Sequence, residues 1–232
     1  MSSLIAILQR AVQTVPPGPV AVAYSGGGDS TALLHALADS AVRERGLRAL
    51  HVDHGLHPRS ATWAGHCRAF AESLGVPIEI LRVTVEPRAG TGPEDAARRA
   101  RYAAFERALR PGEILALAHH RDDQAETVLL KLLRGAGPQG LGGMRFLRKA
   151  GAGWLWRPLL DTPRAALQAY LKDHALAWID DPANANPDLR RNFLRHRIVP
   201  GLKPQWPNAD AALAHSAQWL RAAADFIDDH AA

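Results

Sequence analysis

Cysteine is almost absent from this chain, since Cys67 is the single cysteine among 232 residues. This scarcity excludes an intrachain disulfide framework and a cysteine-rich zinc site, and Cys67 is expected to be a small packed side chain on a helix. Long apolar runs are missing too. No stretch reaches the ~18 apolar residues that a membrane span requires, and the N-terminus lacks the basic start of a signal peptide. We therefore expect a cytoplasmic protein with no membrane partner.

Neither sign of charge dominates, although basic residues are in modest excess. The chain holds 28 Lys+Arg against 23 Asp+Glu, a formal net charge of +5. This surplus suits a polyanionic partner, but many basic proteins bind no nucleic acid, so charge alone does not decide. The length allows one large domain, or one domain with a smaller appendage.

Strand-like and helix-like patterns alternate through the first half of the chain. Strands joined by helical crossovers predict an α/β fold with a mainly parallel doubly wound sheet, covered on both faces. Right-handed crossovers would bring the loops at the carboxyl ends of the strands to one rim, where such folds bind ligands. The expected strands are 20–24, 47–52, 77–83 and 113–118, and the expected helices are 30–45, 59–74, 94–109 and 122–133.

The texture of the sequence changes after Arg134. We expect a domain at residues 1–160 and a small C-terminal helical extension at 161–232. Glycine-rich and Asn/Asp/Pro-rich stretches indicate loops, and a capping residue followed by proline indicates a helix start. The patterns predict a mobile loop at 135–143, a last strand at 154–160, a helix start at 161–163, a loop at 180–192 and a terminal helix at 208–230.

The string YSGGGDS at residues 24–30 lies between a strand pattern and a helix pattern. Glycines there let backbone N–H groups approach an anion at a helix N-terminus, and Ser25 and Ser30 add hydroxyl donors. A carboxylate such as Asp29 suits a phosphate site if a divalent cation lies between them. The alternative is a plain turn in which Asp29 caps the helix. The string lacks the Lys-Ser/Thr ending of the P-loop and does not fit the GxGxxG dinucleotide pattern.

SGGGDS is similar to the SGGxDS signature of the PP-loop ATP pyrophosphatases. This resemblance implies a fold like that of the adenine nucleotide alpha-hydrolases and an enzyme that cleaves ATP to AMP and pyrophosphate. The adenylyl group would activate an oxygen for displacement, and Asp29 would hold Mg²⁺ against the departing pyrophosphate. The residues that the resemblance assigns to ATP are Ser25, Gly26, Gly27, Gly28, Asp29 and Ser30.

Further strings narrow the resemblance: HVDHGL at 51–56, AHHRDDQAET at 118–127, RGAG at 134–137 and RNFLR at 191–195. In this order they resemble the tRNA(Ile)-lysidine synthetases over nearly the whole chain. The resemblance implies a ligase that adenylates the carbon-2 oxygen of the wobble cytidine of CAU-anticodon tRNA(Ile). The ε-amine of free L-lysine would then displace AMP and form lysidine. At His57 this chain departs from the arginine that the family commonly carries, and many members have further C-terminal domains.

Two carboxylates, Asp123 and Glu126, lie three residues apart on a predicted helix and therefore share one face. The helix dipole favours carboxylates near the N-terminus, where they would hold a lysine ammonium. The alternative is the ordinary acidity of a solvated helix start. His119 precedes this helix and would deprotonate the incoming amine or hydrogen-bond the base, although His120 is equally available in the sequence.

Basic residues supply two further predicted roles. Arg98 and Arg101 lie one helical turn apart and would neutralise charge on the α-phosphate; the alternative is an arginine-rich helix surface. A basic C-terminal segment would grip the tRNA backbone, unless it is simply a solvated face. The tryptophans are expected mainly in the core, with Trp178 and Trp206 left open, and the sequence does not distinguish a monomer from a homodimer. The residues assigned to tRNA are Lys131, Arg134, Arg191, Asn192 and Arg195.

Other functions remain as alternatives. Another PP-loop tRNA-modifying enzyme of the thiolase type would commonly need catalytic cysteines or a cluster, which a lone Cys67 does not favour. A PP-loop amidotransferase would need an ammonia source. A non-catalytic protein that binds nucleotide and RNA has no need of a pocket formed by Asp123 and Glu126 for the charge of lysine.

Overall fold

The computed structural model describes residues 3–55, 57–86 and 92–230. They divide into two compact units that interleave along the chain, so each is described separately. The sheet unit comprises Met1–Ala118, Leu147–Pro158 and Leu167–Ile179, and the helical unit comprises the remainder, His119–Phe146, Leu159–Ala166 and Asp180–Ala232. The predicted domain boundary after residue 160 stays a prediction.

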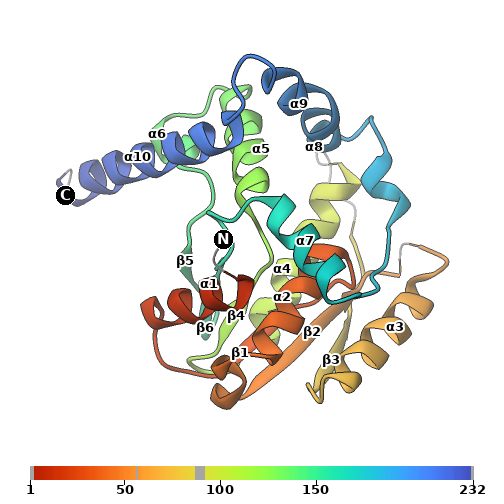
Figure 1. Ribbon diagram of the computed structural model, residues 1–232. Helices are drawn as coiled ribbons and strands as arrows, with labels where there is room; N and C mark the ends of the chain where they lie inside the picture. Colours follow the sequence, from red (N-terminus) through yellow and green to blue (C-terminus); the bar gives the residue numbers. More distant parts are fainter. Residues whose placement is uncertain (1–2, 56, 87–91, 231–232) are drawn as a thin grey trace. The chain divides into compact units, whose positions relative to one another are not determined.

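The sheet unit is built from alternating strands and helices (Figure 1). Its strand order is β3-β2-β1-β4-β6-β5, parallel except for the antiparallel pair of β5 and β6. The doubly wound α/β prediction is therefore confirmed. Its elements are α1 (Leu4–Ala11), η1 (Val12–Thr14), β1 (Val20–Ala23), α2 (Gly28–Ala38), η2 (Ala41–Arg45), β2 (Leu47–Asp53), α3 (Ser60–Ser73), β3 (Ile78–Arg82), α4 (Pro93–Ala108), β4 (Ile114–Ala116), β5 (Leu147–Ala150), β6 (Gly153–Trp156) and most of α7 (Arg164–Asp173).

Alternation along the central strands directs side chains to both faces of the sheet. Ala21 of β1 and Leu50 of β2 pack with Phe105 of α4 in one buried cluster. The intervening residues Val20 and Val22 are also fully buried, and α2 packs against β1 and β2. Burial of both faces explains why these strands read as continuous apolar runs.

Two details of the sheet unit differ from the predicted elements. The helix expected over 30–45 ends at Ala38, because Ser40 turns the chain and its hydroxyl accepts a hydrogen bond from the Val42 N–H at the start of η2. The expected strand over 154–160 is only β6, and it forms a hairpin with β5, a strand that the sequence pattern did not indicate. Cys67 is fully buried on α3, as expected.

The helical unit contains more regular structure than the sequence suggested. The glycine-rich stretch at 135–143 was expected to be a loop, but it holds a short helix with Pro138 in its first turn, a position that proline favours. The expected loop at 180–192 includes a 3₁₀ turn and the start of a helical run. The elements are α5 (Arg121–Leu132), α6 (Pro138–Leu141), η3 (Pro182–Ala185), α8 (Arg190–Phe193), the π-helical turn η4 (Leu194–Ile198), α9 (Val199–Leu202) and α10 (Ala209–His230).

A buried ion pair joins the strands near their amino ends. Arg48 of β2 donates to both carboxylate oxygens of Glu113 at 2.7 Å and to Glu79 of β3 at 2.7 Å. Glu113 is fully buried, whereas the side chain of Glu79 is 52% exposed. Burial raises the pKa of Glu113, but hydrogen bonds from Arg48 and from the Arg110 N–H outweigh it, so this pKa lies below its ordinary value.

We predict that Arg48→Met destabilises the chain by about 3–5 kcal/mol, because it leaves the Glu113 carboxylate buried without its cation. The matched variant Glu79→Gln should cost at most about 1 kcal/mol, since the carboxylate that it removes is half exposed. Urea denaturation measures both free energies of unfolding. The stability that Glu113 contributes is present above its unfolded pKa of about 4.3 and is lost as pH falls through the lowered folded value. If stability falls at acid pH by the same amount in Glu113→Gln as in the wild type, this assignment is contradicted.

Candidate functional site

The loop between β1 and α2 is closed by its own hydroxyl groups. Ser30 Oγ accepts from the Ser25 N–H at 3.2 Å and donates to the Gly27 carbonyl at 2.9 Å, and the two serine hydroxyls lie 3.0 Å apart. Thr31 Oγ1 donates to the Gly27 carbonyl at 3.0 Å. The Gly27 N–H also donates to Ser25 Oγ at 3.3 Å. Together these bonds fix the backbone of the loop.

Gly26 occupies a position that only glycine fills without strain. Its φ is +85°, and an added Cβ would lie 2.5 Å from Ile179 Cδ1 and 2.9 Å from Cys67 Sγ. Its carbonyl accepts from the Ile179 N–H at 2.9 Å. The loop is thus packed between α3 and the segment that follows α7, both within the sheet unit.

Helix α2 begins at Gly28, with Gly27 as the N-cap residue and no capping side chain. Asp29 lies in the first turn of the helix, so it is not the N-cap. The predicted alternative that Asp29 caps the helix is therefore wrong, whereas the phosphate role of the loop stays a prediction. The first amides of a helix lack intrahelical acceptors, and their dipole favours an anion. This geometry suits a phosphate group at the loop.

The carboxyl end of β2 adds polar groups to the sheet unit. His51 Nδ1 lies 2.9 Å from the Tyr24 carbonyl, and burial lowers the pKa of His51. Burial and then the charge of Arg101 lower the pKa of His54, which places the predicted Arg101 beside this end of β2. Arg98 lies instead over the ring of Tyr102, with its guanidinium carbon 5.0 Å from the centroid. His57, where the family pattern departs, stacks on Trp63 at 4.5 Å.

Helix α5, which carries the two carboxylates predicted to bind lysine, starts with a reciprocal cap. His120 Nδ1 accepts from the Asp123 N–H at 3.3 Å, and Asp123 Oδ2 accepts from the His120 N–H at 3.1 Å. His120 is fully buried, while His119 is partly exposed. His119 is therefore the better candidate for proton transfer, because His120 is buried and its Nδ1 belongs to the cap.

Two arginines form ion pairs with the carboxylates of Asp123 and Glu126, which are predicted to bind lysine. Arg191 Nε donates to Glu126 Oε2 at 2.7 Å, and Arg195 Nε donates to Glu126 Oε1 at 2.7 Å. Asp123 Oδ1 accepts from Arg191 at 3.2 Å and from Arg195 at 2.9 Å. We call these four side chains the ionic cluster. Burial raises the pKa of Asp123, but the influence of His120, Arg191, His119 and Arg195 lowers it to about 2.

The residues predicted to bind tRNA differ in their exposure and in the partners of their side chains. Arg191 and Arg195 belong to the ionic cluster, and buried Asn192 donates to the Ala183 and Asn186 carbonyls at 2.9 and 2.8 Å. Arg134 is exposed, and the ammonium of Lys131 lies 3.4 Å from the Gly143 carbonyl. The tRNA role of all five residues stays a prediction.

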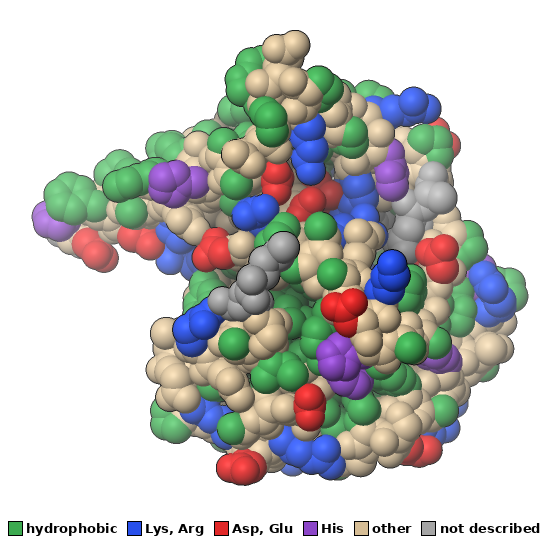
Figure 2. All heavy atoms as spheres, viewed as in Figure 1, with side chains coloured by type: hydrophobic (Ala, Val, Ile, Leu, Met, Phe, Trp, Pro, Cys, Tyr) green, Lys and Arg blue, Asp and Glu red, His purple; other side chains and the backbone are tan. Residues whose placement is uncertain are grey.

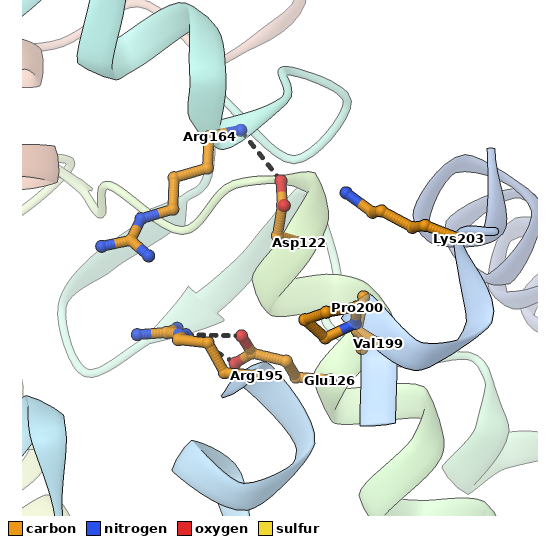
Figure 3. A pocket seen from close by; sticks show the side chains of 7 residues that line it. All are labelled: Asp122, Glu126, Arg164, Arg195, Val199, Pro200 and Lys203. Atoms are coloured by element: carbon orange, nitrogen blue, oxygen red, sulfur yellow. Dashed lines mark hydrogen bonds and ion pairs between the residues drawn. The ribbon is translucent and has the colours of Figure 1, made fainter. Parts of the chain in front are cut away.

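A cavity of about 110 Å³ opens beside the ionic cluster (Figure 3). Figure 3 shows the guanidinium groups of Arg164 and Arg195 on one side and the ammonium of Lys203 directed toward Asp122 from the other. Sequence reasoning did not single out Arg164 or Lys203, because they are far from α5 in the sequence and match no motif. The lining residues are Asp122, Glu126, Arg164, Arg195, Val199, Pro200 and Lys203.

The tryptophans only partly follow the expectation of a core role. Trp156 is fully buried, but Trp219 is 67% exposed on α10, where the expectation is wrong. Trp178 and Trp206, which the sequence left open, are 49% and 63% exposed. Figure 2 shows hydrophobic and histidine side chains along the exposed part of α10. Within the described residues no helix is both long and apolar enough to cross a membrane.

Comparison with known proteins identifies the fold family. Residues 2–202 match the family described as the PP-loop domain. The chain belongs to the PP-loop family. Membership of this family implies ATP binding, and the geometry of the loop between β1 and α2 agrees with a phosphate site.

Curated relatives of this PP-loop chain are tRNA(Ile)-lysidine synthases. The chain is 53% identical to the one from Xanthomonas campestris pv. campestris over 219 residues, which are 94% of this chain and 50% of the relative. Identity to the one from Pseudomonas aeruginosa is 47% over 229 residues, which are 96% of this chain and 51% of the relative. The chain thus spans about half the length of the curated relatives it matches.

Solved structures show the same fold at low sequence identity. The U34-tRNA thiolase NcsA from Methanococcus maripaludis has a TM-score of 0.73 at 17% identity, covering 93% of this chain and 77% of that one. The NH3-dependent NAD synthetase from Campylobacter jejuni has a TM-score of 0.52 at 14% identity, covering 95% and 90%. These likenesses concern the fold alone.

We predict that Gly26→Ala destabilises the chain and abolishes ATP binding, because a side chain is strained at φ +85° and meets Ile179 and Cys67. Gly27→Ala is the matched control for stability alone, since its φ of −72° suits any residue and its added Cβ meets only Ser25 Oγ at 3.4 Å; ATP binding of Gly26→Ala is compared with the wild type. Thermal unfolding and fluorescent ATP-analogue binding measure the two effects. Equal melting temperatures for the two variants would contradict the role of Gly26.

Proposed function

We propose that this chain catalyses lysidine formation on CAU-anticodon tRNA(Ile), using ATP and free L-lysine. The observation that carries the proposal is identity near 50% to curated tRNA(Ile)-lysidine synthases over more than nine-tenths of this chain. The motif strings lie within that matched region, and the loop geometry supports the ATP half of the reaction.

The sheet unit would bind ATP through the loop of Ser25, Gly26, Gly27, Gly28, Asp29 and Ser30. Amides of the first turn of α2 and the serine hydroxyls are suited to phosphate oxygens. Asp29 would hold Mg²⁺ together with the phosphates, which fits a carboxylate in that first turn and a cation that binds proteins through one or two carboxylates. When bound, Mg²⁺ supplies charge neutralisation on the pyrophosphate that departs.

The two steps of the proposed reaction require a group that accepts a proton and groups that neutralise phosphate charge. The cytidine oxygen attacks the α-phosphate and pyrophosphate leaves; the lysine amine then attacks carbon 2, AMP leaves, and the amine gives up a proton. We assign the acceptance of that proton to His119, because His120 is fully buried with its Nδ1 in the helix cap, whereas His119 is partly exposed. Arg98 and Arg101 would neutralise the α-phosphate, and Arg101 is supported by its electrostatic proximity to His54 at the end of β2.

The lysine site would lie at Asp123 and Glu126. Both carboxylates are buried and already paired with Arg191 and Arg195, so an ammonium must share or replace part of those contacts. Glu126 also lines the cavity, which gives a ligand direct access to one side of the ionic cluster.

Contacts to tRNA would be divided between exposed and structural residues. Arg134 is exposed and, with Lys131, would meet backbone phosphate. Arg191, Asn192 and Arg195 would act chiefly by holding the segment α8–η4 in place, because their side chains already have partners inside the unit. A thiolase-type reaction is not supported, since burial raises the pKa of the Cys67 thiol to about 12.

The test is incubation of the chain with ATP, Mg²⁺, radiolabelled lysine and an unmodified CAU-anticodon tRNA(Ile) transcript. We predict label in the RNA, and its loss in Asp29→Ala because the carboxylate for Mg²⁺ is gone. A methionine tRNA transcript is the control RNA. A folded, ATP-binding chain that transfers no lysine would contradict the proposal.

Asp123→Asn should raise the KM for lysine by more than the KM for ATP, about tenfold or more, because it removes one of the two carboxylates that would hold the lysine ammonium. Thermal unfolding of the variant separates this effect from disruption of the ionic cluster. The amide keeps an oxygen for the His120 N–H, so the helix cap persists. Steady-state kinetics with each substrate varied in turn measure both constants. A larger change in the KM for ATP would refute the assignment.

A further inference from the structure

The cavity of the helical unit carries charges that the ionic cluster does not balance. Glu126 and Arg195 line it but pair with one another and with Asp123 and Arg191. The remaining charged groups in the lining are Asp122, Arg164 and Lys203. Lys203 lies 4.0 Å from Asp210, a residue outside the lining. Asp122 and Arg164 remain as one negative and one positive group, which favours a ligand that carries both signs of charge.

Arg164 provides the strongest indication of a missing ligand. Its Nε is buried and has no hydrogen-bond partner among the described residues. A buried guanidinium donor without an acceptor is costly, whereas its backbone N–H is bonded to Asp122 Oδ2 at 2.8 Å. Figure 3 shows the guanidinium extending away from that bond along the cavity. An anion in the cavity would give the fork its acceptors.

Asp122 supplies the complementary charge. The bond from the Arg164 N–H fixes its carboxylate at the cavity, and Lys203, the cation directed toward it, lies 4.0 Å from Asp210 on α10. A cation on the ligand would therefore find a positioned carboxylate close to the arginine. The cavity thus presents separate partners for a negative and a positive group.

We propose that this cavity binds the head group of a free amino acid, with Arg164 on the α-carboxylate and Asp122 on the α-ammonium. The inference rests on the proposed lysine ligation and adds residues that its motifs do not contain. About 110 Å³ corresponds to roughly three or four water volumes, which suits a head group and excludes a nucleoside. A phosphate is disfavoured because it would face the carboxylates of Asp122 and Glu126.

The test is calorimetric titration of the full chain with three ligands: L-lysine, 6-aminohexanoate, which lacks the α-ammonium, and 1,5-diaminopentane, which lacks the carboxylate. Arg164→Gln should weaken L-lysine and 6-aminohexanoate by about 10- to 100-fold and change 1,5-diaminopentane by less than about twofold. Asp122→Asn should weaken L-lysine but not 6-aminohexanoate. Arg164→Lys should lie between wild type and Arg164→Gln, because it keeps the charge and loses the fork.

Arg107→Gln, which removes an exposed arginine of α4, is the matched control and should bind all three ligands as the wild type does. Equal weakening of all three ligands by Arg164→Gln would indicate a structural role and overturn the inference. An unchanged affinity for L-lysine in Arg164→Gln would overturn this inference alone, and the proposal of lysine ligation would stand. A wild-type chain that binds none of the three ligands would overturn both. Loss of RNA binding in Arg164→Gln with unchanged lysine affinity would assign the cavity to phosphate and also contradict it.

Discussion

The ionic cluster on α5 is the interaction on which the helical unit depends. Asp123 and Glu126 are nearly inaccessible to water, and two guanidinium groups from α8 and η4 occupy their oxygens. Removing one member of such a cluster leaves an uncompensated buried charge, which costs far more than a surface pair contributes. The segment 190–198 is therefore fixed to α5 by charge as well as by buried Leu194. The π-helical turn η4 lies within this segment. Single π-helical turns often occur at functional sites.

The loop before α2 follows the opposite principle. Its hydroxyl groups are bonded to one another and to its own carbonyls, and Gly27 leaves the start of the helix without a capping side chain. The backbone at the start of α2 is thus fixed before any ligand binds, which is the preorganisation that an anion site requires. In the sheet unit the loop before α2 is fixed by its own hydroxyl groups and has no capping side chain, whereas in the helical unit the carboxylates are already paired with arginines.

The sequence predicted the fold well because the signals were strong and local. Buried parallel strands separated by amphipathic helices produce periodic patterns that survive without tertiary information. The edge strand β5 was missed because Leu147–Ala150 is short and half of its residues are charged, and its pairing with β6 depends on a turn rather than on periodicity. The helix α6 was missed because glycine usually indicates a loop, while here Pro138 initiates a single turn.

The candidate site was predictable in its residues but not in their pairing. Spacing shows that Asp123 and Glu126 share a face, and it does not show that this face meets Arg191 and Arg195. That pairing imposes a condition on the ligand. A simple amine that approaches the carboxylates competes with guanidinium groups and leaves them without acceptors. A ligand that brings its own carboxylate keeps the charges balanced, so a cluster of this kind favours a zwitterionic amino acid over an amine of the same length.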